Sequence, residues 1–359
     1  MRIAIGLARR GHGNVWPNPS VGCVVVRDDA VVGRGWTQPG GRPHAETEAL
    51  RRAGEAARGA TAYVTLEPCA HQGQTPPCAR ALIEAGIARV VIGVRDPDPR
   101  VDGGGISMLA EAGIEVAEGI CPAAAETVAA GFLTRVRQGR PMVTVKTATT
   151  LDGRIATASG DSEWITGPLS RALGHGMRAR HDAILVGART AIVDDPSLTC
   201  RLPGLEAESP VRVVVDGRSD LPLTHALVAT AGATPTWLLT RADGDAARRR
   251  AFEDAGVRLI DVPPDGQGNL DLGAALSALG EAGITRLMVE GGGRIIAGLF
   301  RAGLVDRLVW FRAPKVIGGD GVPAIAAFGV GELDGAPNFV KVSSRPAGSD
   351  IVETYLCER

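Results

Sequence analysis

The sequence is poor in aromatic residues, in net charge and in cysteine. Phe, Trp and Tyr make up only 4% of its 359 residues, and the formal net charge is −1. Few aromatics and balanced charge argue against a nucleic-acid groove with stacking platforms and against a general attraction to anionic membranes. Six cysteines over this length do not make a disulfide scaffold. We therefore expect no nucleic-acid partner and no membrane partner.

Long apolar stretches are also lacking. No apolar run approaches about 18 residues, the length that a membrane-spanning helix needs. No basic-then-apolar leader precedes Asn18. Hydrophobic residues make up 45% and charged residues 22%, which is typical of a globular chain. We expect a cytoplasmic protein.

The chain is too long for one ordinary domain, and the order of its predicted elements divides it in two. Short β-rich runs alternate with helical segments from residue 21 to about residue 119. A second alternating series begins at Pro141, and residues 339–356 resemble a terminal antiparallel pair. Such alternation predicts α/β domains in which helices cover a sheet. We expect the first domain to span 1–139 and the second to span 140–359.

The first half contains a His-x-Glu motif that is followed by two cysteines. His44, Cys69 and Cys78 offer one imidazole and two thiols, and a catalytic zinc site takes three protein ligands of these kinds. His44 and Cys78 each fall at the start of a predicted helix, where the helix N-terminus favours a thiolate. Glu46 could take a proton from water at the open position and deliver it to a leaving amine.

The spacing of this motif leaves one alternative. Eight residues separate the two cysteines, which is longer than the usual C-x-x-C. A chance His-x-Glu with two cysteines buried as small hydrophobes would need no metal. The three elements in order, on alternating strands and helices, favour zinc.

Asn18 lies between two prolines just before the first predicted strand. The prolines fix the backbone there, and the amide could pair with both donor and acceptor atoms of a heterocycle. A simple turn residue is the other interpretation, and this position alone does not decide between them.

The second half has no G-x-G-x-x-G after its first predicted strand. Its best candidate for a phosphate loop comes late, where a predicted strand is followed by Gly291, Gly292 and Gly293 and then by a helix. Glycines let backbone N–H groups approach a pyrophosphate at a helix N-terminus. Glycine-rich turns without a ligand are common, so the loop is weak evidence by itself.

Long stretches of the chain together resemble one known family. They include NPSVGCVVV, PHAETEAL, TAYVTLEPCAHQGQTPPC, VRDPDPRVDGGG, TLDGRIATASGDSEWIT, DDPSLTCRLPG and VEGGG, and they span essentially the whole chain. The family is the bifunctional deaminase/reductase of riboflavin biosynthesis. The resemblance implies an N-terminal cytidine-deaminase-like domain and a C-terminal dihydrofolate-reductase-like domain. It also implies zinc-dependent deamination of a diaminopyrimidine ribosylamine phosphate, followed by NADPH-dependent reduction of its ribose to a ribityl chain.

The resemblance further implies which residues of the second half form the reductase site. For the cofactor NADPH the implied residues are Trp164, Thr190, Asp194, Gly291, Gly292 and Gly293. For the substrate the implied residues are Lys146, Ser162, Arg178, Leu198, Arg201 and Glu290. Trp164 could instead be a packing residue, and both Asp194 and Lys146 are candidates for the proton donor.

Two positions depart from the family's usual pattern. Thr37 stands where a substrate-contacting His is common, and Gln74 stands where Lys or Arg is common. Both changes fall on presumed substrate contacts of the deaminase half, whereas the presumed metal and proton-transfer residues are intact. His71, inside the cysteine loop, could contact substrate or merely order that loop.

Two other functions are compatible with parts of the sequence. A general nucleoside or nucleic-acid deaminase would keep zinc and change the substrate, and the scarcity of aromatics argues against nucleic acid. A structural zinc module would need a fourth protein ligand, for which only His71 is close in the sequence. We expect a small phosphorylated pyrimidine as the substrate and a homo-oligomeric enzyme.

Overall fold

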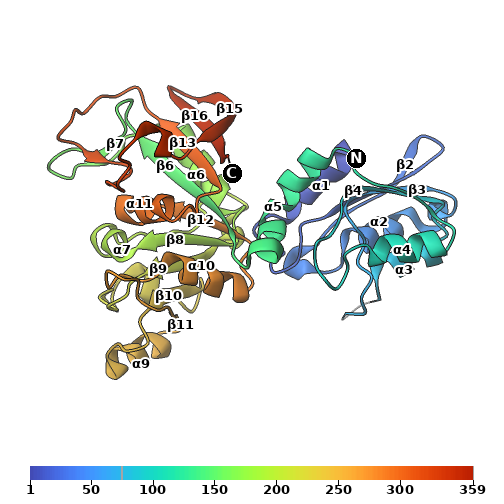
Figure 1. Cartoon of the computed structure of the whole chain (residues 1–359), viewed down its shortest axis with the longest axis horizontal. Coiled ribbons are helices and arrows are strands. Elements are labelled where there is room, and N and C mark those ends of the chain that lie inside the picture. The colour runs from blue at the N-terminus through green and yellow to red at the C-terminus, as the bar shows by residue number, and fades with distance from the viewer. Residues whose placement is uncertain (74–75, 359) are drawn as a thin grey trace. The chain divides into compact units, whose positions relative to one another are not determined.

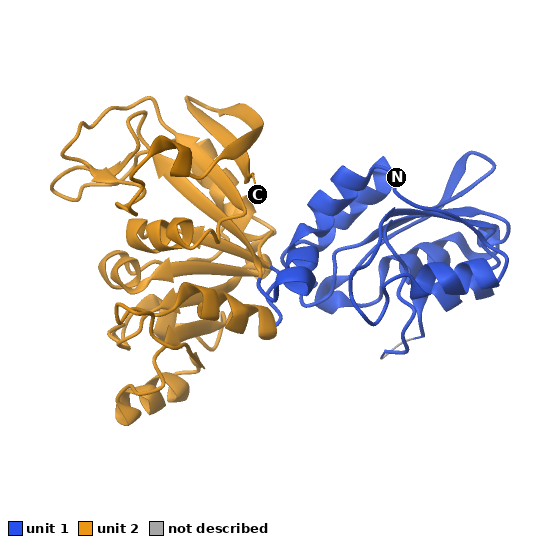
Figure 2. Ribbon diagram, in the orientation of Figure 1, with its two compact units in different colours: residues 1–140, 283–285 blue, residues 141–282, 286–359 orange. Residues whose placement is uncertain are grey.

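The computed structural model describes residues 1–73 and 76–358, and these form two compact units. Unit 1 comprises residues 1–140 with 283–285, and unit 2 comprises residues 141–282 with 286–359 (Figure 2). Gln74, one of the two departures from the family pattern, lies outside the described residues. Among the helices that are described, none has the length and apolar character to cross a membrane.

The described part of unit 1 contains one five-stranded sheet, in the order β2-β1-β3-β4-β5. β1 pairs antiparallel with β2 and β3, whereas β3, β4 and β5 run parallel. β1 and β2 therefore form a hairpin. The strands are β1 (Gly22–Arg27), β2 (Ala30–Trp36), β3 (Thr61–Leu66), β4 (Arg89–Val94) and β5 (Glu115–Ala117).

Helices lie on both faces of this sheet (Figure 1). α1 and α5 pack together on one face, and α2, α3 and α4 cover the other. The bounds are α1 (Arg2–Ala8), α2 (Ala45–Ala53), α3 (Cys78–Glu84), α4 (Gly104–Glu111) and α5 (Pro122–Gln138). His44 immediately precedes α2, and Cys78 is the first residue of α3. The N-termini of these two helices therefore position two of the candidate ligands.

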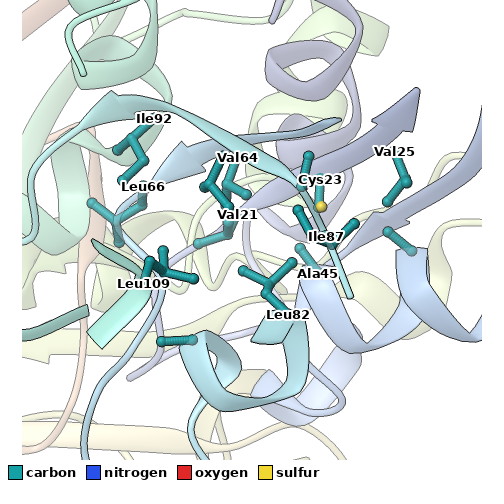
Figure 3. Packing of buried hydrophobic residues seen from close by; sticks show 14 of the residues in the cluster. Val21, Cys23, Val25, Ala45, Val64, Leu66, Leu82, Ile87, Ile92 and Leu109 are labelled. Atoms are coloured by element: carbon teal, nitrogen blue, oxygen red, sulfur yellow. The ribbon is translucent and has the colours of Figure 1, made fainter. Parts of the chain in front are cut away.

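A layer of aliphatic side chains joins the sheet to the helices of unit 1 (Figure 3). Val21, just before β1, and Cys23 and Val25 on β1 are all buried in this cluster. Ala45 on α2 and Leu82 on α3 pack into the same cluster. The side chains on this face of the sheet pack against the small alanine side chains of α2. The first turn of α2 therefore lies directly against the sheet.

The described part of unit 2 contains a nine-stranded sheet, in the order β11-β10-β9-β8-β12-β6-β13-β16-β15. The strands from β11 to β13 in this order run parallel, and β16 and β15 add an antiparallel pair at one edge. The terminal antiparallel pair was predicted and is confirmed. The bounds are β6 (Met142–Thr149), β8 (Ala183–Gly187), β9 (Val211–Val215), β10 (Thr236–Thr240), β11 (Arg258–Asp261), β12 (Arg286–Glu290), β13 (Arg307–Arg312), β15 (Phe339–Ala347) and β16 (Asp350–Cys357). β7 (Arg154–Ala156) and β14 (Val322–Pro323) form a separate antiparallel pair.

The strand order of unit 2 reverses beside β12. β12 lies between β8 and β6, although it follows both in the sequence. In open parallel sheets, ligands bind at the carboxyl ends of the strands where the order reverses. The helices are α6 (Pro168–Arg178), α7 (Ala188–Asp194), α8 (Ala226–Ala229), α9 (Ala246–Asp254), α10 (Leu272–Glu281) and α11 (Gly293–Arg301). α7 and α11 follow β8 and β12 directly, so their first turns lie at this reversal.

Candidate active sites

Three potential metal ligands converge in unit 1. His44 precedes the first turn of α2, Cys69 follows β3, and Cys78 is the first residue of α3. The Nδ1 atom of His44 lies 3.2 Å from the Sγ atom of Cys78 and 3.8 Å from that of Cys69. All three ligand atoms lie within 4.8 Å of one another. One imidazole nitrogen and two sulfurs at this separation suit a tetrahedral zinc ion with one position open.

Hydrogen bonding prepares the two thiols for metal binding. The hydrogen bond from Cys78 lowers the pKa of the Cys69 thiol to about 4. The backbone N–H of Cys78 also donates to the Cys69 sulfur, at 3.3 Å. The shared bond and burial raise the pKa of Cys78 well above its usual value. Two sulfurs that share one proton lose it when a metal binds, because metal ligation requires thiolates.

Glu46 lies beside these ligands in the first turn of α2. Its residue surface is only 4% exposed, and this burial raises the pKa of its carboxyl group to about 7. A carboxyl group whose pKa is near neutral can both accept and release a proton under physiological conditions. Its surroundings therefore suit a proton-transfer group rather than a fixed counter-charge.

A cavity of about 290 Å³ opens onto this group. Its wall includes Asn18, Thr37, His44, Glu46, Cys69 and His71. The structure thus brings two of the predicted ligands, the predicted acid and both predicted deaminase substrate residues to one cavity, and Cys78 lies behind them against His44. A volume of this size is at the lower end of the range for small-molecule sites.

Asn18 reaches the cavity because of a glycine. A Cβ atom built on Gly41 would lie only 2.0 Å from the amide nitrogen of Asn18, so a side chain at Gly41 would displace the amide. Gly41 also has a φ of +84°, a backbone conformation that glycine adopts readily.

Thr37 and His71 differ in how they meet the cavity. The hydroxyl of Thr37 donates to the Pro19 carbonyl and accepts from the Val21 N–H, each at 3.0 Å. This side chain therefore ties down the segment before β1. The Nδ1 atom of His71 is buried, and it has no hydrogen-bond partner among the residues that the structure describes.

A second buried carboxylate, Glu67, lines the same cavity, and the sequence alone did not indicate it. Glu67 is 3% exposed and accepts four backbone N–H bonds, at 3.1–3.2 Å. The donors are Asp96, Gly103, Gly105 and Ile106. The position of Glu67, directly after β3 and two residues before the ligand Cys69, was the sequence signal that could have indicated this role.

The segment bonded to Glu67, residues 96–106, contributes charged side chains to the cavity wall. Asp98 and Arg100 both line it, and the Arg100 guanidinium donates to the Asp98 carboxylate at 2.9 and 2.5 Å. These hydrogen bonds lower the pKa of Asp98. Arg42 and Arg135 contribute two further guanidinium groups to the wall. The cavity wall therefore carries guanidinium groups next to the carboxyl groups of Glu46, Glu67, Asp96 and Asp98.

In unit 2, three of the predicted residues form one buried ionic group. Lys146 on β6 and Glu290 on β12 face each other across the parallel ladder, with Nζ 2.9 Å from Oε1. Arg178 on α6 donates to the other oxygen of Glu290, through Nε at 2.9 Å and Nη2 at 2.8 Å. Burial alone would raise the pKa of Glu290, but the two cations lower it to about 2. Glu290 is the last residue of β12, so the group lies at the carboxyl end of the strand where the order reverses.

The glycine loop lies at the same reversal. Gly291 and Gly292 have φ values of +87° and +82°, which side chains disfavour, and α11 begins at Gly293. Atoms of Thr190 on α7 lie 3.5 and 3.6 Å from Cβ positions built on Gly291 and Gly292. Burial, with a contribution from Glu163, raises the pKa of Asp194 at the end of α7. The loop leaves backbone N–H groups at a helix N-terminus open to a phosphate.

Trp164 lies on an exposed loop rather than in the core. It is 57% exposed, which decides against a packing role. The Arg171 guanidinium lies 4.5 Å from the centre of its ring, and Lys315 donates to its carbonyl oxygen at 2.7 Å. Ser162 is exposed on the same loop. A flat aromatic face presented this way can stack against a planar ligand.

Leu198 and Arg201 lie on the segment after α7 and differ in their environment. Leu198 is 3% exposed, packs into the core and has a φ of +53°, so only its backbone can reach a ligand. Arg201 is exposed, and its guanidinium donates to the Ser197 hydroxyl at 2.8 Å. Arg178 donates to the Thr199 carbonyl at 2.9 Å, which joins this segment to the ionic group.

Two family models match the chain. Residues 1–94 match the cytidine and deoxycytidylate deaminase zinc-binding region, and residues 141–352 match the RibD C-terminal domain. The chain is 42% identical to riboflavin biosynthesis protein RibD of Escherichia coli (strain K12), over 98% of this chain and 96% of the relative. It is 43% identical to RibD of Bacillus amyloliquefaciens, over 99% and 95%.

Solved structures agree with this over the full length. Acinetobacter baumannii RibD, form 1, superposes with a TM-score of 0.88 at 36% identity, covering 100% of this chain and 98% of that one. A diaminohydroxyphosphoribosylaminopyrimidine deaminase/5-amino-6-(5-phosphoribosylamino)uracil reductase from Thermotoga maritima superposes with a TM-score of 0.86 at 34% identity, covering 99% and 97%.

Fold, site and relatives define a bifunctional enzyme with a zinc-binding deaminase domain followed by a reductase domain of the NADPH-dependent type. The chain belongs to the RibD family of riboflavin biosynthesis enzymes. The predicted α/β class with these two domains, the two activities and the cofactors zinc and NADPH are confirmed at this level. Membership in this family decides against both rival functions.

Proposed function

We propose that residues 1–139 deaminate diaminohydroxyphosphoribosylaminopyrimidine and that residues 140–359 reduce the product, 5-amino-6-(5-phosphoribosylamino)uracil. The description of the Thermotoga maritima relative supports this pair of substrates. The observation that carries the proposal is the grouping of His44, Cys69 and Cys78, with His44 and Cys69 lining one cavity together with the buried Glu46.

In the deaminase half, His44, Cys69 and Cys78 would hold zinc. When bound, zinc acidifies water and so makes it a nucleophile at neutral pH. Glu46 takes a proton from the attacking water and delivers it to the departing amine. A pKa of about 7 suits both transfers, because the group must be basic first and acidic afterwards.

Other side chains of the cavity orient the pyrimidine. The Asn18 amide can donate to a ring acceptor and accept from an amino group. The buried Nδ1 atom of His71 offers a second polar contact from the cysteine loop. Thr37 supports the wall through its two backbone bonds and leaves base recognition to these two residues.

In the reductase half, the cofactor contacts are Gly291, Gly292, Gly293, Thr190, Asp194 and Trp164. NADPH, when bound, supplies the hydride that reduces the opened ribose. The glycine loop would hold the pyrophosphate with backbone N–H groups at the start of α11, and the exposed Trp164 ring would contact the cofactor.

The substrate contacts are Lys146, Glu290, Arg178, Ser162, Arg201 and the backbone of Leu198. The ionic group around Glu290 orients the sugar, because its three charged groups are fixed by short bonds. Lys146 is the better-placed proton donor, since its ammonium is held at the strand ends by Glu290. Arg201 and Ser162 bind the phosphate, for which the planar guanidinium is well suited.

Metal content tests the central assignment. We expect about one zinc per chain in the purified protein and a loss of most of it in Cys69→Ser, as for a three-ligand site. Cys121→Ser is the matched control, because Cys121 is exposed and lies outside the group. Undiminished zinc in Cys69→Ser would refute the ligand set.

We also propose that the enzyme works as a homo-oligomer in the cytoplasm. Sedimentation at several protein concentrations measures the first property, and fractionation of cells measures the second. A protein that sediments as a monomer at all concentrations would contradict the oligomer.

A further inference from the structure

His175 lies one helical turn before Arg178 on α6 and faces the same segment of chain. Its Nδ1 atom is 3.2 Å from the carbonyl oxygen of Thr199 and 3.2 Å from the backbone nitrogen of Arg201. A helix places residues three apart on one face, so both side chains of α6 reach the 199–201 segment together.

One ring nitrogen cannot donate to the carbonyl and accept from the N–H at the same time. The Thr199 carbonyl already accepts a bond from Arg178, at 2.9 Å. The Arg201 N–H can only donate, and the His175 nitrogen is the acceptor near it. The satisfied arrangement therefore has an unprotonated Nδ1 that accepts from Arg201, with the ring proton on Nε2.

The surroundings favour this neutral ring. Burial, followed by the positive charges of Arg178 and Arg201, lowers the pKa of His175. The Thr199 carbonyl and Glu290 act in the opposite direction and do not overcome these effects. At neutral pH the imidazole is uncharged, and its Nδ1 atom can accept a hydrogen bond.

We propose that His175 is a positioning residue of the reductase, whose imidazole fixes the backbone of Arg201 so that its guanidinium meets the substrate phosphate. The bond to Ser197 restrains the other end of the Arg201 side chain. A long exposed side chain loses less freedom on binding when its backbone is already fixed. The inference rests on the proposed role of Arg201.

Two substitutions separate the hydrogen bond from the volume of the ring. In His175→Asn, the Oδ1 atom occupies the same position along the side chain as Nδ1 and keeps an acceptor. His175→Leu has a similar shape without an acceptor. Losing one neutral hydrogen bond should raise the KM for the phosphorylated intermediate about three- to tenfold in His175→Leu. The KM for NADPH and the deaminase rate should not change, and His175→Asn should stay close to wild type.

The pH dependence provides a readout that a merely structural residue would not move. As pH falls through the pKa of His175, its Nδ1 gains a proton and can no longer accept from Arg201. The wild-type KM for the intermediate should therefore rise at acidic pH relative to that of His175→Asn. Titration of the substrate phosphate affects both proteins equally and cancels in this ratio.

Arg201→Ala separates the proposed role of His175 from the proposed phosphate contact of Arg201. A wild-type KM for the intermediate in folded His175→Leu, beside a raised KM in Arg201→Ala, overturns the role of His175 alone. A wild-type KM in Arg201→Ala overturns the proposed phosphate contact. An equal defect in His175→Asn and His175→Leu also overturns the acceptor role. Deaminase activity and thermal unfolding of each variant check that the chain has folded.

Discussion

At the scale of single residues, Glu46 differs from its neighbour Glu48 in what surrounds its carboxyl group. Glu48 is paired with Arg51 and Arg52, and the hydrogen bond from Arg51 lowers its pKa. Among the described residues no Lys or Arg pairs with Glu46, and burial raises its pKa to about 7. Two acids only two residues apart in α2 therefore differ in chemistry: Glu48 stays charged, whereas Glu46 can exchange a proton near neutral pH.

Replacing Glu46 should abolish deamination alone. Glu46→Gln keeps the size of the side chain but cannot take up a proton, so the deaminase rate should fall about 100- to 10,000-fold. Zinc content and reduction of the deaminated intermediate should remain near wild type. The assay measures ammonia release and NADPH consumption separately, with Glu48→Gln as the matched control that keeps deamination. Substantial ammonia release by Glu46→Gln would contradict the assigned role.

Residues that bind the metal were easier to predict than residues that position other parts of the site. His44, Cys69 and Cys78 are recognisable because few residue types bind zinc and their order is characteristic. Glu67 and His175 act through backbone N–H groups, which carry no residue-specific signal in the sequence. Their partners lie 26 to 39 positions away, so only the fold reveals them.

At the scale of elements, the loop between β4 and α4 depends on Glu67. Its carboxylate accepts four N–H bonds, whereas a glutamine amide would turn an NH₂ group toward two of those donors. Each unsatisfied buried donor costs about 1–3 kcal/mol. Glu67→Gln should therefore raise the deaminase KM at least about tenfold and lower the unfolding temperature. A titration with the pyrimidine substrate and thermal unfolding measure both effects, and unchanged values would contradict the role of this carboxylate.

The ionic group between β6, β12 and α6 should make unit 2 sensitive to acid. The pKa of Glu290 is lowered to about 2 in the folded chain, against 4.5 as its ordinary value. Its contribution to stability is therefore present above about pH 4.5 and is lost as pH falls toward 2. Glu290→Gln leaves Lys146 and Arg178 without their counter-charge, which should cost about 3–5 kcal/mol at neutral pH.

Urea unfolding of both proteins at several pH values between 7 and 3 tests this sign. The stability difference between wild type and Glu290→Gln should be constant above about pH 5 and should shrink below it. A difference that grows on acidification would contradict the ion pair.

The hydrophobic pattern made individual strands and helices predictable, but it could not predict the order of the strands in the sheet. The apolar run around Val21, Cys23 and Val25 predicts β1, and the strand is buried on both faces, since Val24 between them is also buried. Nothing local in β12 shows that it pairs between β8 and β6, since those partners lie more than a hundred residues away. The meeting of Lys146 with Glu290 follows from that pairing, so it too required the structure.

At the scale of the whole molecule, each proposed site is built from residues of a single unit. The metal group and its cavity belong to unit 1, and the ionic group and the glycine loop belong to unit 2. Variants in one unit should therefore leave the other reaction intact, which makes each half an internal control for the other.

The most direct test of the account is product analysis with the diaminopyrimidine substrate, with and without NADPH. Without NADPH, we predict ammonia release equal to substrate consumed and accumulation of 5-amino-6-(5-phosphoribosylamino)uracil. With NADPH, that intermediate should disappear, and the ribityl product should form in equal amount to NADPH oxidised. Absence of ammonia release by zinc-loaded protein, or NADPH oxidation without a ribityl product, would contradict the claim that one chain carries both steps.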